Sequence, residues 1–406
     1  MKGFYYKSLG IKCFLIGIFV FAVSLLLPFN LRNISTISFA LSIFFLIVQN
    51  NNLKFSNPKL LIINLLFFVI VLVSLSYSDN KNLGFNRLSV IIPLIIIPLC
   101  FSLVESKSKG IIEKHSKNIV GIFIVSLVIF HLTIFFHNYL NGYLNKSIFL
   151  HYPQRMNVGY QDYSMHPIYM SLYVSVAMIL LIPIAEKAKS YFQVALVLSS
   201  LLFLSIILLM LARKGPIIVT FSILLIYFLS RPKKIEALII LIFGFTTVFS
   251  IFYNTIPLKV RFLEFWDSVF NNYNQLGSTS IRFRLIDCSI SNIKERAFFG
   301  FGIGGSKEVL SECISNNENI FKGNYYNTHN QYLSAWLAAG LPGILSLVFM
   351  LFYNLRKSII QKNFTAFSIL TLFITIMFTE NILERQDGIL IFSFFINFFA
   401  FKTFKK

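Results

Sequence analysis

The sequence is dominated by apolar runs that are long enough to cross a lipid bilayer. A helix needs about 20 mostly apolar residues to span the hydrocarbon core, and twelve runs approaching that length follow one another along the 406 residues. They lie at 12–29, 34–49, 59–77, 88–104, 118–138, 166–184, 191–211, 215–230, 234–253, 330–353, 364–379 and 387–402. A soluble fold of this size cannot bury so much apolar surface. The sequence therefore predicts an all-α polytopic membrane protein with about twelve transmembrane helices.

Basic residues predict the orientation of these helices. If the N-terminus is cytoplasmic, the cytoplasmic segments carry 20 of the 36 Lys and Arg residues, and the short outer loops carry 8. The other 8 lie in the segment 254–329, and long loops cross the membrane largely regardless of charge. Both termini are therefore predicted to be cytoplasmic. The net charge of +20 is then explained by attraction of the cytoplasmic Lys and Arg residues to anionic lipid of the inner leaflet. Since the sequence has no concentrated basic patch, we predict no nucleic-acid partner.

The polar segment 254–329 divides the predicted domains. Nine helices lie in residues 1–253, a large outer loop follows at 254–329, and three helices lie in 330–406. Two stripes in the loop predict amphipathic helices. The first stripe consists of Phe262, Phe265, Trp266, Val269 and Phe270, and the second, on a helix over 280–298, of Ile286, Ile290 and Ile293. Cys288 and Cys313 share this loop, and the sequence leaves open whether they form a disulfide.

Two cations interrupt an apolar stretch on the predicted outer side. Arg213 and Lys214 separate the runs that end and begin there. A tight helical hairpin, with Gly215 in the turn and Pro216 at the first position of the next helix, is one interpretation. It does not explain two cations on the side where the positive-inside bias disfavours them. Since a guanidinium can bind phosphate in a bidentate manner, we predict a phosphate-binding role for Arg213 with Lys214 beside it.

A histidine lies at the outer end of the tenth run, in the segment Thr328-His329-Asn330. Thr328 is predicted to cap the following helix, which would place His329 in its first turn. A neutral imidazole at that height can act as a general base on an alcohol. We therefore predict His329 as a catalytic residue.

Two further polar groups and a glycine-rich segment lie at the predicted outer surface. Glu380, Arg385 and Gln386 crowd the short turn before the last run, where a solvated loop with a Glu384–Arg385 pair is the alternative to a binding role. His166 and Tyr169 begin the sixth run, where a helix start signal is the alternative. The segment 299–305 has four glycines and is predicted to form a turn whose backbone N–H groups face an anion.

The sequence contains none of the common metal or nucleotide motifs. Paired Asp-x-Asp carboxylates, zinc-spaced Cys and His residues, a Walker loop and a nucleophile elbow are all missing from the printed residues. The prediction is therefore chemistry that uses no metal and no cofactor.

Five segments together resemble one family. They are Ala212-Arg213-Lys214-Gly215, Arg282 at 18 residues before Gly300, His329-Asn330-Gln331-Tyr332-Leu333 followed by Gly340-Leu341-Pro342-Gly343, the segment 380–386, and His166-Pro167-Ile168-Tyr169. The chain resembles the bacterial O-antigen ligase and polymerase superfamily of inner-membrane glycan transferases. The resemblance covers roughly residues 160 to 399.

The resemblance implies both a fold and a reaction. It implies a fold related to the class C membrane glycosyltransferases, and transfer of a glycan from undecaprenyl diphosphate to an acceptor hydroxyl at the periplasmic face of the inner membrane. The reaction would be metal-independent and would invert the anomeric centre. Ligases use the lipid A-core of lipopolysaccharide as acceptor, whereas O-antigen, capsule or exopolysaccharide polymerases use another carrier-linked glycan. The sequence does not decide between ligase and polymerase.

The site residues follow from combining the resemblance with the pattern of charges. His329 is predicted to be the general base and Arg213 to stabilise the diphosphate, with Arg282 as a second phosphate ligand. Lys214, His166, Tyr169, Glu380, Arg385, Gln386 and Asn330 are predicted to bind the substrates. A polytopic transporter is the alternative from another class, but transporters place ionisable residues near the midplane of the bilayer, and here they gather at the outer ends of the runs.

Overall fold

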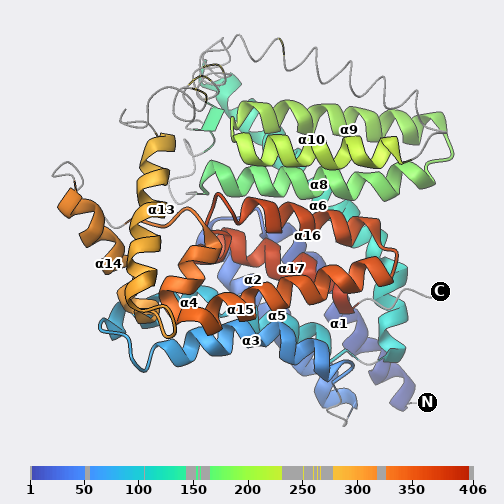
Figure 1. Ribbon diagram of the computed structural model, residues 1–406. Helices are drawn as coiled ribbons and strands as arrows, with labels where there is room; N and C mark the ends of the chain where they lie inside the picture. The colour runs from blue at the N-terminus through green and yellow to red at the C-terminus, as the bar shows by residue number, and fades with distance from the viewer. Residues whose placement is uncertain are drawn as a thin grey trace. The chain divides into compact units, whose positions relative to one another are not determined.

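The computed structural model describes residues 2–50, 55–104, 106–142, 165–230, 278–317 and 326–401, together with the single residues 152, 153, 156, 250, 259, 263 and 266. All regular structure within these ranges is helical (Figure 1). The prediction of an all-α chain is confirmed.

Many of the described helices are apolar. Five have the length and composition of a membrane span, at Lys81–Ser102, Glu113–Leu140, Pro167–Lys187, Tyr191–Met210 and Gln331–Ile360. Shorter apolar helices coincide with six more of the predicted runs. The run at 234–253 lies outside the described residues except for one residue. The chain is a multi-pass membrane protein, and the number of twelve spans stays a prediction.

The chain divides into two compact units. Unit 1 consists of Met1–Leu53 and Ser106–Leu263, and unit 2 of Lys54–Glu105 and Glu264–Lys406. Each unit is therefore built from two separate stretches of sequence. The predicted division at residues 253 and 329 concerns the sides of the membrane and stays a prediction.

Unit 1 is a helical bundle in which one helix is buried. The helices that the structure describes in it are α1 (Lys2–Ser24), α2 (Phe29–Asn50), α6 (Ser106–Leu140), α8 (Pro167–Lys187), α9 (Tyr191–Met210) and α10 (Lys214–Leu229). Helix α8 packs against α6, α9 and α10, and α8, α9 and α10 run alongside one another in Figure 1. All residues from Pro167 to Ile182 are buried, as expected for a helix that is apolar on every face.

Unit 2 surrounds one long helix. Its elements are α3 (Pro58–Ser74), α4 (Lys81–Ile91), α5 (Pro93–Ser102), α13 (Ser278–Glu295), α14 (Gly302–Asn317), α15 (Gln331–Ile360), α16 (Phe364–Ile376), η3 (Ile382–Glu384) and α17 (Gln386–Phe401). Helix α15 packs on α3 and α16, while α17 packs on α5. Helix α13 runs across the end of this bundle in Figure 1.

Three asparagines connect the helices inside unit 2. Asn354 of α15 donates to Asn64 of α3, and Asn64 donates to Asn397 of α17, each over 2.8 Å. All three side chains are buried. Because a buried amide needs a partner in an apolar environment, this chain of bonds fixes the relative rotation of the three helices.

The turn that joins α13 to α14 packs against a kink in α15. The backbone leaves the helical conformation at Ala339 and Gly340, and Gly340 has a φ of +63°. A Cβ atom on Gly340 would lie 2.1 Å from the carbonyl oxygen of Phe298, so only glycine fits. The N–H of Leu341 and the indole N–H of Trp336 both donate to the carbonyl of Ala297. These bonds attach the α13–α14 turn to α15.

The helices α13 and α14 are joined by a disulfide between Cys288 and Cys313. Helix α13 coincides with the helix expected over 280–298. Of its predicted apolar face, Ile293 is buried and Ile286 is half-buried, whereas Ile290 is 42% exposed. Helix α14 was not predicted. The other predicted amphipathic stripe lies outside the described residues apart from Trp266.

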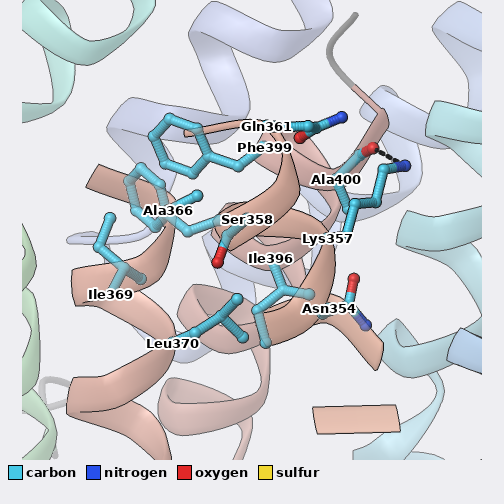
Figure 2. A pocket seen from close by; sticks show the side chains of 11 residues that line it. Asn354, Lys357, Ser358, Gln361, Ala366, Ile369, Leu370, Ile396, Phe399 and Ala400 are labelled. Carbon is cyan, nitrogen blue, oxygen red and sulfur yellow. Dashed lines mark hydrogen bonds between the residues drawn. The ribbon is translucent and has the colours of Figure 1, made fainter. Parts of the chain in front are cut away.

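A small cavity lies at the C-terminal end of α15. Figure 2 shows Lys357 beside it, with its ammonium donating to the carbonyl of Ala400 over 2.5 Å. Its volume of about 10 Å³ is close to the space that one water molecule needs. Lys357 lies 26 residues after the start of α15, which is roughly 40 Å along the helix. The cavity is therefore far from His329, which precedes the other end of α15.

Candidate active site

Two acidic residues on the connection between α16 and α17 organise the charged groups of unit 2. Glu380 and Glu384 are four residues apart and flank the start and the end of η3. Their side chains are 11% and 7% exposed. A carboxylate buried to this extent needs partners with compensating charge, and each of the two has them.

Glu380 contacts an arginine and a histidine at the same time. Its Oε1 accepts from Nη2 of Arg282 at 2.5 Å, and its Oε2 lies 3.2 Å from Nδ1 of His329. Arg282 comes from α13, and His329 from the segment just before α15. Both of these side chains are 35% exposed, so a substrate can reach them. The structure thus brings together three of the predicted site residues.

The carboxylate fixes which nitrogen of the imidazole is available. If Nδ1 carries the proton and donates it to Glu380, the lone pair of the neutral ring is on Nε2. His329 itself has a φ of +48°, a left-handed conformation that histidine tolerates better than most residues. The predicted cap is wrong: Asn330, not Thr328, accepts from the N–H groups of Tyr332 and Leu333. His329 therefore precedes the helix instead of lying in its first turn.

Glu384 holds a second charged cluster. It pairs with Arg87 of α4 at 3.5 Å and with Lys307 of α14 at 3.2 Å. It also accepts hydrogen bonds from Ser334 of α15 and from Asn381. Four segments of unit 2 therefore meet at one carboxylate.

These contacts correct the alternative that placed Glu384 in a solvated pair with its neighbour. Arg385 is exposed, and Glu384 forms ion pairs with Arg87 and Lys307. Burial on its own would raise the pKa of the Glu384 carboxyl. The two cations outweigh burial, and together with the bonds from Ser334 and Lys307 they lower this pKa to about 2. Glu384 is therefore ionised at any physiological pH.

Sequence reasoning did not select Arg87 and Lys307. Both lie in segments predicted to be on the outer side, where cations are disfavoured, and that argument had selected Arg213. Applied to every outer cation, it would also have selected Arg87. The partner of each cation could not have been found in this way, because Arg87 and Glu384 are almost 300 residues apart in the sequence.

A small cavity lies against the Glu384 cluster. Its volume is about 30 Å³, which is enough for one or two water molecules. Four polar side chains and seven apolar ones line it: Arg87, Gln331, Ser334 and Glu384, with Phe67, Val71, Ile91, Ile303, Ala335, Ala338 and Leu383. The mixed lining suits water that hydrates the charged groups.

The glycine-rich segment has a different role from the one predicted. The N–H of Ile303 donates to the hydroxyl of Ser74, and those of Gly304 and Gly305 donate to the hydroxyl of Ser78. These N–H groups cap the start of α14 and do not face an anion. A Cβ atom on Gly304 would lie 1.8 Å from the carbonyl oxygen of Asn80, so glycine permits this close approach.

The predicted residues of unit 1 lie at helix starts. Arg213 precedes α10 at the N-cap position, and Lys214 is its first residue. The left-handed residue at this turn is Ala212, with a φ of +51°. The predicted hairpin therefore needs correction, because neither Gly215 nor Pro216 has the position expected for it. Both cations are partly exposed.

His166 also lies at a helix start. Its Nδ1 accepts from the N–H of Ile168 at 3.4 Å, which caps α8, and Pro167 follows it. Tyr169 is buried and its ring lies 6.3 Å from the imidazole. This geometry explains His166 as the residue that caps the start of α8. A substrate-binding role for either residue stays a prediction.

The remaining predicted residues surround the charged clusters of unit 2. Asn330 caps α15, Gln386 begins α17, and Arg385 lies between Gln386 and η3. The structure thus gathers most of the site residues predicted in unit 2 around α15 and the α16–α17 connection.

Comparison with known proteins agrees with the sequence motifs. Residues 198–348 match the family model of the O-antigen ligase domain. The matched segment contains Arg213, Arg282 and His329, while Glu380 and Glu384 lie beyond its end. No curated protein matches the chain. Over these residues the chain is similar to the O-antigen ligase domain.

Proposed function

We propose that the protein transfers a glycan from undecaprenyl diphosphate to a sugar hydroxyl at the periplasmic face of the inner membrane. The family supports glycan transfer in general terms. The observation that carries the specific proposal is the carboxylate of Glu380, which contacts both the imidazole of His329 and the guanidinium of Arg282.

In the proposed mechanism, His329 acts as the general base. Its Nε2 takes the proton of the acceptor hydroxyl while the hydroxyl oxygen attacks the anomeric carbon of the donor sugar. The bond from that carbon to the diphosphate oxygen breaks, and the electron pair leaves with the diphosphate. Glu380 holds the imidazole in the tautomer that accepts a proton and stabilises the imidazolium that forms. Attack opposite the leaving group inverts the anomeric centre.

The diphosphate needs positive charge as it leaves. Arg282 has five N–H donors, and its bond to Glu380 uses one of them. The other donors can bind phosphate oxygens, and bonds that strengthen as the negative charge develops lower the barrier. Arg213 is proposed as a further phosphate ligand because the positive-inside bias disfavours a cation on the predicted outer side and a guanidinium can bind phosphate in a bidentate manner. We propose no metal or cofactor.

Ligase and polymerase share this chemistry and differ in the acceptor. We propose a ligase that uses lipid A-core as acceptor, because the matching family model is that of the O-antigen ligase. Surface glycans of a deletion strain distinguish the two: unattached long chains indicate a ligase, and single repeat units on the core indicate a polymerase.

The test of the mechanism is a transfer assay with purified protein. Carrier-linked glycan and acceptor are incubated in the presence of EDTA, and transfer is followed on a gel. Loss of the general base in the His329→Ala variant is expected to reduce turnover by roughly 10²–10⁴-fold, and Arg213→Ala is also expected to reduce it. Arg356→Ala, at an exposed position near the C-terminal end of α15, is the matched control for removal of a charge.

Near-wild-type turnover in correctly folded His329→Ala protein would overturn the assignment of the base. A transporter predicts a different result, since solute uptake into proteoliposomes would then proceed with no glycan present. The positions of the charged groups in unit 2 favour the enzyme, because they lie at the ends of α15, α16 and α17 and not at their centres.

A further inference from the structure

We infer that Glu384 is a positioning residue that holds His329 in place for proton transfer, although it does not itself touch the substrate. This inference rests on the proposed role of His329. It concerns the contacts that link the second charged cluster to the histidine through Asn381 and Thr328.

The first link runs from Glu384 to Asn381. The side-chain amide of Asn381 donates to Oε1 of Glu384 at 2.6 Å, and the side chain of Asn381 is buried. Arg87, Lys307 and Ser334 hold the same carboxylate from three other helices. Since Glu384 is attached on all of these sides, it fixes the orientation of the Asn381 amide.

The second link runs from Asn381 to the residue before the histidine. The amide nitrogen of Asn381 also donates to the hydroxyl of Thr328 at 3.1 Å. The same hydroxyl donates to the carbonyl of Asn330 at 2.7 Å and accepts from its N–H at 3.2 Å. Thr328, the residue before His329, is therefore bonded both to Asn381 and to Asn330, the residue after His329 that caps α15.

The backbone of His329 explains why such attachment is needed. Its φ of +48° is an unfavourable conformation for a residue with a side chain, and it persists only where neighbouring contacts enforce it. The bonds of Thr328 enforce it here. Glu380, in the same connection as Asn381 and Glu384, then contacts the imidazole. One short connection thus holds both the backbone and the ring of His329.

Loss of this attachment should affect the chemical step more than donor binding. A displacement of about 1 Å in a catalytic group can cost about 10²-fold in rate. We expect Glu384→Gln and Thr328→Val each to reduce kcat about 10- to 100-fold with the KM for the donor unchanged. Thr328→Ser keeps the hydroxyl and should retain wild-type turnover.

A double-mutant cycle tests whether the two residues act through one path. If they do, the Glu384→Gln/Thr328→Val variant loses no more activity than the more impaired single variant, because removing one link already breaks the path. Glu384→Gln should likewise add no further loss in the His329→Ala background. Additive losses, a loss that lies in KM, or wild-type turnover in both single variants would each overturn the inference.

The thermal midpoint of each variant separates positioning from folding. Should Glu384→Gln fail to fold, the comparison of Thr328→Val with Thr328→Ser decides alone, because both leave the ion pairs of Glu384 intact. Equal turnover in those two variants would then refute the inference. The proposed function fails by a different result, namely full activity in His329→Ala.

Discussion

At the scale of single residues, the two carboxylates of the α16–α17 connection have distinct tasks. Glu380 contacts the groups proposed to react, and its partners are 35% exposed. Glu384 is surrounded by cations and hydroxyl and amide donors, and its side chain is 7% exposed. The difference in partners and exposure separates a group that can meet a substrate from one that holds the site together.

The pKa of Glu384 leads to a prediction about acid. Its value of about 2 lies below the ordinary 4.5, so ionised Glu384 stabilises the folded state at any pH above 4.5. This contribution is lost as the pH falls from 4.5 toward 2. We therefore expect the thermal midpoint in detergent to fall over this range in wild-type protein and to fall less in Glu384→Gln. Parallel pH curves for the two proteins would contradict this expectation.

The site residues that the sequence revealed are those with a local signature. His329 and Glu380 stand in recognisable segments at predicted outer ends of helices, and Arg282 lies in the predicted outer loop, at a spacing from Gly300 that resembles the family. Lys307 had no such signature, because its importance depends on a carboxylate 77 residues away. The cap of α15 was misplaced by two residues because Thr328 and Asn330 are both good capping residues, and only the tertiary contact of Thr328 with Asn381 distinguishes them.

At the scale of elements, tertiary contacts decided what local propensity could not. Helix α14 begins with three glycines in its first four residues, and glycine is a poor helix former. The hydroxyls of Ser74 and Ser78 compensate by capping its first N–H groups. By contrast, the apolar runs predicted their helices well, because a bilayer requires every backbone group to be bonded within the segment.

The disulfide between α13 and α14 gives a prediction at this scale. It links the helix that carries Arg282 to the helix that carries Lys307, and closes a loop of 25 residues. A crosslink of this size typically stabilises a protein by about 3 kcal/mol. We expect reductant to lower the thermal midpoint of wild-type protein and to have no effect on a Cys288→Ser/Cys313→Ser variant. Removing the free thiols Cys13 and Cys100 is the control, and a reductant effect that required these two would refute the prediction.

At the scale of the whole molecule, the predicted topology requires all outer-side residues to be reachable from one side of the membrane. Single cysteines at positions 213, 282 and 329 should react with an impermeant thiol reagent in intact spheroplasts, and a cysteine at 187 should react only after lysis. The background is a variant without native cysteines. Opposite accessibility of positions 213 and 329 would end the proposal that both act on one diphosphate.

The break at Gly340 divides α15 into two rods of unequal length. The second rod, from Leu341 to Ile360, contains 20 residues, and at 1.5 Å per residue it is about 30 Å long. This equals the thickness of the hydrocarbon layer, so this rod alone is sufficient to cross it. If the second rod spans the hydrocarbon layer, the shorter rod, which begins beside His329, lies at the depth of the lipid headgroups. In the proposed mechanism, the diphosphate that reacts beside His329 would therefore stay outside the hydrocarbon layer.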